Sequence, residues 1–516
     1  MTLRPYSIIA PALVLLATAV PAASQELTHI EGLGSLSFPN SGAPEAQHDF
    51  LRGVLLLHSF EYAYAAEAFR KAQRQDPDFG MAYWGEAMTY NHPIWNQRDR
   101  DAAMAALERL APTRETRLAK AATERERAFL AAVEILYQDG PKPQRDTAYA
   151  QAMEQLAARF ADDAEAQAFY ALSLLGLSSG VRVVPTYMRA AAIAEQIAAA
   201  HPNHPGAVHY MIHAYDDPVN APLGLRAARA YSTIAPDAAH AQHMTTHIFS
   251  AMGMWDEVVS QNTIAADLTW WGPGHYTLWL GYGLLQRGQP GAALRHLERA
   301  RENLARRTNP GTLSYFTLMR AHHVVSGDRW NDAALEWNID LAGVGPVARA
   351  ADAFAQAVAA LERGDRTRAA EELARLAAVE ANRSRAPDVL ERELRGLLAL
   401  EEGRTEAALD LLREATRIED GMPVEFGPPD VVKPSHELLG EVLLRLHRAE
   451  EAQRQFEQAL ALAPNRALSL LGLGRAALAA GDRETAARAY GTLREIWHDA
   501  EHGLAGLEEA RQFVSR

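Results

Sequence analysis

The sequence predicts an all-α protein, a right-handed superhelical solenoid built from stacked helical hairpins. Its composition is rich in alanine, leucine, glutamate and arginine, which favour helix over strand. Sequence features also recur at a fixed step: His243 follows His209 by 34 residues, and Pro236 follows Pro202 by the same interval. A period of this length is typical of repeated helical hairpins. A chain of 516 residues is too long for one hydrophobic core but suits such a stack.

Charge and cysteine content exclude several classes of function. The formal net charge is −14, with acidic and basic side chains interspersed along most of the predicted helices. This pattern is typical of solvated helix surfaces, and it argues against a nucleic-acid partner. The sequence contains no cysteine. Disulfides, thiolate metal sites and cysteine nucleophiles are thereby excluded.

Residues 1–24 have the pattern of a secretory signal peptide. One early arginine is followed by an apolar run and then by small residues, with a plausible cleavage position after Ser24. No later segment is apolar over the roughly 18 residues that a membrane span needs. We therefore expect an exported protein without a membrane span, located in the periplasm or secreted.

Residues 49–95 have the pattern of one complete repeat and the first helix of the next, with small residues, one phenylalanine and a proline at characteristic places. They are Gly53, Ala65, Phe69, Ala72 and Pro77. Small residues let paired helices approach each other, and proline ends the second helix. This pattern resembles the tetratricopeptide repeat (TPR), and we assign residues 25–98 to N-terminal TPR-like repeats. The resemblance implies that the first helix of each repeat lines a concave groove.

The resemblance continues along most of the remaining chain. Residues 99–200 are less regular and predict degenerate helical hairpins, whereas residues 201–345 predict central histidine-rich repeats. The turn glycines of this central part recur at steps of 35 and 39 residues, at Gly253, Gly288 and Gly327. Residues 346–516 hold the most regular repeats, interrupted by a proline- and glycine-rich segment at 421–434 that predicts a long surface loop or flap.

Six histidines of the central repeats form a candidate metal site. Two pairs have i,i+4 spacing, which places both imidazoles of a pair on one helix face. The second pair repeats the first after 34 residues, and by resemblance both pairs face the groove. His240 shares the face of the second pair, and His275 holds the equivalent place on the next repeat. The predicted ligands are His209, His213, His240, His243, His247 and His275.

Packed neighbouring helices lie about 8 to 10 Å apart, so these imidazoles could reach one ion or a pair of ions. Sites rich in imidazole suit zinc, copper, nickel or iron, and we expect copper or zinc first, with iron also open. Asp216 and Asp217 could add ligands or second-shell acceptors, and they are the candidate acid/base residues if the site is catalytic. Candidates for an aromatic wall are Trp270, Trp271, Tyr276 and Trp279.

The histidine-bearing segments also resemble those of a group of uncharacterised exported bacterial TPR proteins. These carry an H-Y-x-I-H-A segment, here His209 to Ala214, followed by H-x-x-H-M-x-x-H-I, here His240 to Ile248. The resemblance implies no activity. It shows that the histidine arrangement does not depend on how the repeats of this one sequence are aligned.

Other catalytic motifs are missing. The segment His243 to His247 lacks the glutamate of the HExxH metalloprotease helix, and the sequence has neither a P-loop nor a GxSxG elbow. Whether the protein is an enzyme stays open. The alternative is a metal-free scaffold that binds a peptide or a partner protein in its groove, with the regular repeats of residues 346–516 as the natural place for it.

The remaining histidines are mostly expected to be structural or exposed. His58 and His92 are 34 residues apart and could form a second site with Glu86, although packing at the groove edge is the simpler interpretation. His322 and His323 are adjacent, so at most one of them could join the central site. The histidines without an assigned role are His201, His204, His296, His436, His447, His498 and His502.

Overall fold

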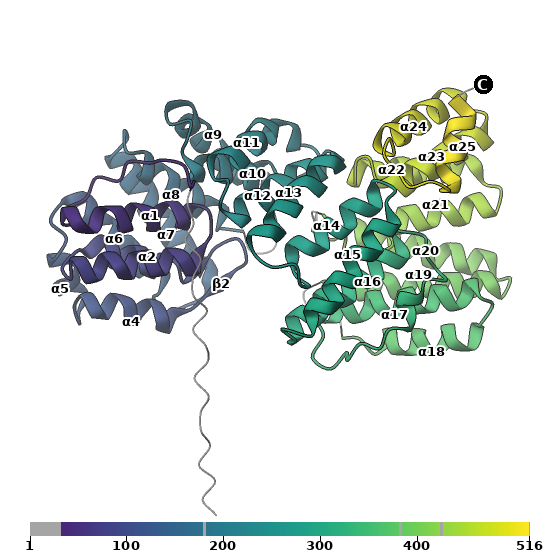
Figure 1. The fold of residues 1–516 in the computed structure, drawn as a ribbon, viewed down its shortest axis with the longest axis horizontal. Helices are drawn as coiled ribbons and strands as arrows, with labels where there is room; N and C mark the ends of the chain where they lie inside the picture. The colour runs from purple at the N-terminus through teal and green to yellow at the C-terminus, as the bar shows by residue number, and fades with distance from the viewer. Residues whose placement is uncertain (1–31, 179–181, 381–383, 424–426, 515–516) are drawn as a thin grey trace, which may run out of the picture.

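A computed structural model describes residues 32–178, 182–380, 384–423 and 427–514 of the chain. The predicted signal peptide at 1–24 lies outside these residues. In the part described, the chain is an all-α stack of helical hairpins, as the sequence predicts (Figure 1). Its only strands there are two short antiparallel ones, in which Asn91 pairs with Arg98 and His92 with Gln97. None of the described helices combines the length and the apolar character that a membrane crossing requires.

The elements of the first half follow one another with short connections. A 3-10 turn η1 (Pro44–Ala46) comes first, and the two strands are β1 (Asn91–His92) and β2 (Gln97–Arg98). The helices before the histidine region are α1 (Gln47–His58), α2 (Tyr62–Gln75), α3 (Gly80–Met88), α4 (Arg100–Leu110), α5 (Arg114–Ala119), α6 (Glu124–Leu136), α7 (Lys142–Arg159), α8 (Ala164–Leu175) and α9 (Val184–Ala200).

The histidine region and the C-terminal part follow in the same manner. The central helices are α10 (Pro205–Tyr215), α11 (Ala221–Ile234), α12 (Ala239–Ala251), α13 (Trp255–Leu268), α14 (His275–Gln286), α15 (Pro290–Leu304) and α16 (Pro310–Val325). After a 3-10 turn η2 (Ala333–Glu336) come α17 (Pro346–Glu362), α18 (Arg366–Ala377), α19 (Ala386–Glu401), α20 (Thr405–Asp420), α21 (Ser435–Arg445), α22 (Ala449–Leu462), α23 (Ala467–Ala480), α24 (Arg483–Ile496) and α25 (Ala505–Val514).

Small residues bring the paired helices together, as the repeat pattern predicts. The ring of Phe69 on α2 is fully buried and lies against Gly53 of α1 and Gly85 of α3. A Cβ atom at either glycine would come within 2.7 Å or 2.3 Å of this ring. Because no side chain fits at that distance, the glycines let three consecutive helices close around one aromatic core residue.

Contacts between distant repeats depart from a solenoid whose repeats touch only their neighbours. The N-terminal helix α1 packs directly against α10, so the first repeat lies beside the histidine region. The C-terminal part also returns to the central repeats: Asn465 Nδ2 donates to the carbonyl of Met252 at 3.2 Å, and Arg466 donates to the hydroxyl of Tyr282 at 2.7 Å. The histidine region is therefore held from both sides.

Gly253 makes the close approach of Asn465 to the central repeats possible. It follows α12 with φ of +66°, a left-handed conformation that costs glycine little. A Cβ atom there would lie 2.2 Å from that of Asn465. The turn glycine of this repeat is thus needed both for its backbone conformation and for the approach of the C-terminal part.

Three segments differ from the sequence-based expectation. Residues 89–98 form the strand pair instead of continuing the helix α3. The hairpin that begins with α16 has the short η2 turn where a second α-helix is expected. The segment 421–434 is not wholly a surface loop, since Val431, Val432 and Lys433 are buried; residues 424–426 lie outside the described part.

Candidate metal centre

Three neighbouring first helices carry the six central histidines. Helix α10 holds His209 and His213, α12 holds His240, His243 and His247, and α14 begins at His275. Their side chains gather into two groups of three instead of one cluster of six. We call them the inner group, His209, His213 and His240, and the outer group, His243, His247 and His275.

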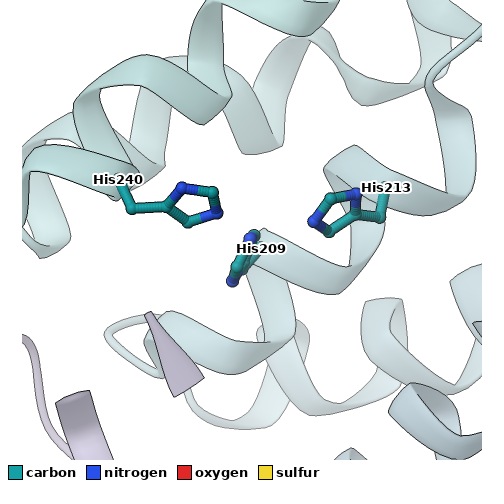
Figure 2. A group of neighbouring side chains, drawn as sticks. All are labelled: His209, His213 and His240. Atoms are coloured by element: carbon teal, nitrogen blue, oxygen red, sulfur yellow. The ribbon is translucent and has the colours of Figure 1, made fainter. Parts of the chain in front are cut away.

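The inner group is buried, and its imidazoles point toward one another (Figure 2). One ring nitrogen of each lies within 4.8 Å of the other two. The Nε2 atoms of His209, His213 and His240 are all buried, and none has a hydrogen-bond partner within the described residues. Burial lowers the pKa of His209 to about 3 and those of His213 and His240 well below 6.5. These imidazoles are therefore neutral at pH 7, the state that binds a metal.

A hydrogen bond fixes the tautomer of His209. Its Nδ1 lies 2.7 Å from the carbonyl oxygen of His58, which can only accept. Nδ1 therefore carries the proton, and the Nε2 lone pair is directed into the inner group. Such an outer hydrogen bond is the usual means of orienting a metal-binding histidine.

Phe60 covers the inner group. Its ring centroid lies 4.4 Å from that of His209, and it stacks on His213 and His240 at 5.7 Å each. Phe60 reaches this position from the turn between α1 and α2, where its φ is +55°. This conformation is rare for a bulky residue, so the surrounding contacts must stabilise it.

The outer group is more accessible. His243 is fully buried and the side chain of His247 is 14% exposed, whereas His275 is an exposed residue at the start of α14. The Nε2 atoms of His243 and His247 lie 3.2 Å apart. The three side chains together hold one ring nitrogen each within 4.8 Å of the others.

Two acceptors fix the tautomers of the outer pair. His243 Nδ1 lies 2.8 Å from Asn262 Oδ1, whose amide nitrogen in turn donates to Val258 O and Thr246 Oγ1. His247 Nδ1 lies 2.7 Å from the carboxylate oxygen Oδ2 of Asp216. Since both acceptors require a donated proton, both imidazoles carry it on Nδ1.

When both imidazoles are neutral, the two facing Nε2 atoms bring lone pairs together. Two nitrogen ligands of a tetrahedral zinc ion, each about 2.0 to 2.1 Å from it, lie roughly 3.3 Å apart. The observed separation of 3.2 Å between His243 and His247 matches this value. A cation between the two nitrogens would turn a repulsive arrangement into a bonding one.

The two predicted acidic residues differ in role. Asp216 contacts the outer group through His247 and is 4% exposed. Asp217 instead pairs with Arg182 at 2.9 Å and caps the following turn through the amides of Val219 and Asn220. The geometry makes Asp216 an acceptor for the candidate ligand His247 and gives Asp217 a structural role.

Only part of the predicted aromatic wall adjoins the imidazoles. Trp279 stacks on His247 with ring centroids 4.6 Å apart, and Tyr276 lies 4.8 Å from His243. Trp271 contacts His296 and the guanidinium of Arg299 instead. Trp279 also touches Gly427, where a Cβ atom would come within 2.3 Å of the indole, so the 421–434 segment reaches this side of the outer group.

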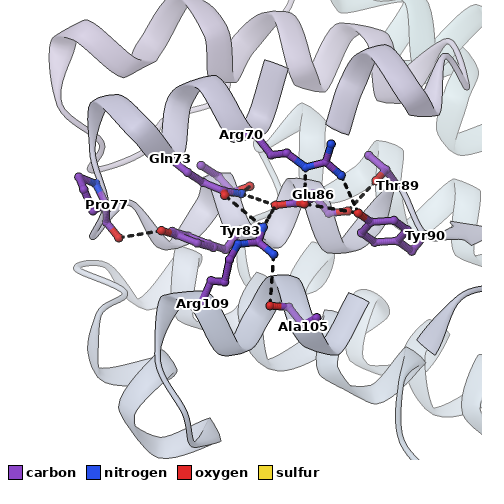
Figure 3. Close-up of polar contacts among 10 residues, drawn as sticks. Arg70, Gln73, Pro77, Tyr83, Glu86, Thr89, Tyr90, Ala105 and Arg109 are labelled. Atoms are coloured by element: carbon purple, nitrogen blue, oxygen red, sulfur yellow. Dashed lines mark hydrogen bonds and ion pairs between the residues drawn. The ribbon is translucent and has the colours of Figure 1, made fainter. Parts of the chain in front are cut away.

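The suggested second site of His58, His92 and Glu86 is not formed. Glu86 is buried between the guanidinium groups of Arg70 and Arg109, with Gln73 Nε2 donating at 2.7 Å (Figure 3). His92 lies on β1, where its ring stacks on that of Tyr62. The two histidines are separated by one repeat length, but they do not lie on equivalent helices. The strand pair replaces the end of the helix on which His92 was expected.

His58 belongs to a different buried network. Its Nε2 lies 2.8 Å from one oxygen of Glu165, whose other oxygen lies 3.0 Å from His204 Nε2. Tyr210 and the amide of Ala207 supply partners for the remaining nitrogens of His58 and His204. Although burial would raise it, the two imidazoles lower the pKa of Glu165 to about 2. With all four nitrogens bonded, this network is structural, and it holds the His58 carbonyl against His209.

His322 and His323 also stay outside both groups. His323 Nε2 lies 3.0 Å from Asp332, and the His322 ring packs edge-on against Tyr282. Sequence reasoning missed three residues that shape the centre: Phe60, Asn262 and the carbonyl of His58. Phe60 comes from a distant repeat and Asn262 from a second helix, so neither shares a spacing signal with the histidines.

The C-terminal repeats enclose a separate groove. It has a volume of 760 Å³ and is lined by apolar and charged side chains. Among the lining residues are Phe354, Leu397, Leu438, Glu441, Arg445 and Arg475. None of the described histidines lines it.

In its fold the chain is a TPR-like helical-repeat protein. No protein-family model matches the sequence, and no curated protein matches it. Three similar solved structures have low sequence identity to this chain.

The Cut9–Hcn1 heterotetramer of the APC/C is 11% identical in sequence, and the match covers 93% of this chain and 78% of that chain, with a TM-score of 0.33. A human IFIT1 dimer with m7Gppp-AAAA is 14% identical, and the match covers 93% of this chain and 92% of that chain, with a TM-score of 0.36. A monomeric IFIT1 mutant with Gppp-AAAA is 15% identical, and the match covers 86% of this chain and 95% of that chain, with a TM-score of 0.38. These values describe a likeness in architecture alone.

Proposed function

We propose that this protein binds transition-metal ions through its inner and outer histidine groups, for metal handling or metal-dependent catalysis. One observation carries the proposal: in each group, one ring nitrogen from each of three histidines lies within 4.8 Å of the other two. Hydrogen bonds from Nδ1 of His209, His243 and His247 leave their Nε2 lone pairs directed inward. An alternative in which the imidazoles satisfy one another fails for the inner group, whose three buried Nε2 atoms have no hydrogen-bond partner in the described part of the chain.

The ligand set favours particular metals. Three neutral imidazoles suit zinc and copper, and iron or nickel also accepts such ligands. With no cysteine in the sequence, thiolate cannot direct the choice toward a soft ion. The predicted signal peptide supports export to the periplasm or beyond, where the protein would meet metal ions outside the cytoplasmic buffers.

The proposal is tested by titrating metal-free protein with Co²⁺ and following its visible absorption. Two equivalents should bind, with intense bands because nitrogen ligands give a low-coordinate site. The double variant H209A/H213A should lose one equivalent and H243A/H247A the other. H48A, which removes an exposed histidine, is the matched control. Absorption that stays that of free Co²⁺ at every concentration would refute metal binding.

A second candidate function is supported by the C-terminal groove, whose apolar floor and charged rim suit a peptide or a segment of a partner protein. Screening a displayed random-peptide library against the purified chain would test it. Binders that are lost in L438R and retained in H243A/H247A would support this function. A library without binders would count against it.

A further inference from the structure

The two histidine groups differ in how much of the surrounding protein covers them. In the inner group His209 is fully buried, and His213 and His240 are each 8% exposed. The outer group combines the buried His243 with the partly exposed His247 and the exposed His275. Both groups thus supply three imidazoles, but only the outer one extends to the surface.

Aromatic rings close the inner group. Phe60 lies against all three imidazoles, and Tyr231 stacks on His209 with ring centroids 5.2 Å apart. Trp95 approaches His240 edge-on at 5.7 Å. Phe60 and Trp95 offer no ligand atom and Tyr231 only its phenol oxygen, so an ion among these buried imidazoles would keep only protein ligands.

Aromatic rings also flank the outer group, but its third histidine is an exposed residue. Trp279 stacks on His247, while His275 stands at the first position of α14 and is an exposed residue. Tyr276 and Tyr315 also lie beside His275, with ring centroids 6.2 Å and 6.3 Å from that of the imidazole. Three imidazoles fill three positions of a tetrahedral ion, so the fourth would face the exposed side.

The charges favour an anion in that position. Imidazoles are neutral ligands, and a divalent ion bound by three of them keeps both positive charges. The carboxylate nearest to the outer group is Asp216, which already accepts the proton of His247 Nδ1. The net positive charge that remains attracts small anions and small neutral donors rather than cations.

We infer that the outer site takes a small anionic ligand in an open fourth position, whereas the inner site is closed by Phe60 and exchanges neither ligand nor metal readily. The inference rests on the proposed metal binding and names the ligand class of one of its two sites. It also assigns the two sites different tasks: the inner ion is retained, and the outer ion is accessible to substrates or to a metal acceptor.

Azide is the probe, added to protein loaded with two equivalents of Co²⁺. We expect azide to change the absorption of one ion only. The response should persist in H209A/H213A and vanish in H243A/H247A. An excess of EDTA should remove the outer ion at least about tenfold faster than the inner one, since water and chelator reach only the outer ion.

The variant F60G tests whether Phe60 is what closes the inner site. Glycine accepts the φ of +55° at this position, and the loss of the ring uncovers the inner imidazoles. The inner ion should then also respond to azide and exchange as fast as the outer one. Far-UV circular dichroism of F60G and the control H48A checks the fold.

Several results would overturn the inference. Azide acting on both ions in the unaltered protein, or on the inner ion alone, contradicts it, as does equal release of both ions to EDTA. An F60G variant that binds two ions and behaves like the parent also contradicts it. Failure of Co²⁺ to bind at all would instead refute the proposed function, so the two failures are distinguishable.

Discussion

The central and C-terminal repeats use the same helical hairpin for different surfaces. In the central part, the first helices α10, α12 and α14 bring six imidazoles together in a largely buried space. In the C-terminal part, α17, α19, α21 and α23 enclose an open groove of 760 Å³ without histidine. The backbone architecture is the same, so the side chains at the groove-facing positions decide what each part can bind.

The largest expected effect is the stabilisation of the native protein by metal, which should depend on the histidines of the central part alone. Zinc at 1,000 times its dissociation constant should stabilise the native protein by about 4 kcal/mol for each site. The variant H209A/H213A/H243A/H247A should lose this stabilisation entirely. Thermal unfolding with and without zinc measures it, and H48A/H502A, which removes two exposed histidines, is the control. A quadruple variant still stabilised by zinc would contradict the assignment.

The next effect concerns the C-terminal part. Arg466 is fully buried and pairs with Glu437 through two hydrogen bonds while donating to Tyr282. R466M leaves Glu437 buried with one partner fewer, and should destabilise the protein by about 3 to 5 kcal/mol. Urea unfolding measures this loss.

Its matched control is R445M, which breaks an exposed pair with Glu362 on the groove rim and should cost less than about 1 kcal/mol. Both variants should keep two metal equivalents. Loss of metal in R466M would mean that the two parts are not independent in function.

A smaller effect should come from the acceptor of His247. D216N retains an oxygen for the hydrogen bond from Nδ1 but removes the negative charge that strengthens the imidazole as a ligand. Metal affinity at the outer site should fall about 10- to 100-fold, with the inner site unchanged. Competition with a chromophoric chelator measures both affinities. D217N, placed on the Arg182 side, should leave them as they are.

The smallest effect is a pH dependence of the metal-free protein. Burial lowers the pKa of His209 to about 3, against 6.5 in the unfolded chain, so the folded state binds fewer protons below pH 6.5. The stability that this histidine contributes is therefore complete above pH 6.5 and declines toward pH 3, by up to about 1.4 kcal/mol per pH unit.

Unfolding free energies at pH 7.5, 6.0 and 5.0 would reveal this slope. H209F keeps a buried ring but cannot titrate, and its stability should fall less over the same range. Equal slopes for H209F and the parent would show that His209 is protonated in the folded state.

The fold could be predicted because its signals are local. The 34-residue interval between His209 and His243 and the glycines at helix crossings depend on neighbouring turns and repeats. The cover that Phe60 forms over the inner group could not be predicted, since Phe60 arrives from the first repeat, whose helix α1 packs on α10. Contacts of this range leave no periodic trace in a sequence.

The failed site of His58, His92 and Glu86 shows the same limit. The interval between the two histidines matched the repeat, but the strand pair at residues 91–98 removed His92 from the helix. His204, expected to be structural, does take part in a buried network with Glu165. Spacing alone predicts which residues share a helix face, and the hydrogen-bond partners decide whether their nitrogens are free to bind a metal.

Metal content tests the central claim most directly. The mature protein would be purified from its exported form without a histidine tag, beside H209A/H213A/H243A/H247A, and both analysed for zinc, copper, iron and nickel. We predict close to two equivalents of metal in the parent and none in the variant, with equal helicity. Two well-folded, metal-free proteins that also bind none of these ions when they are supplied would contradict the account.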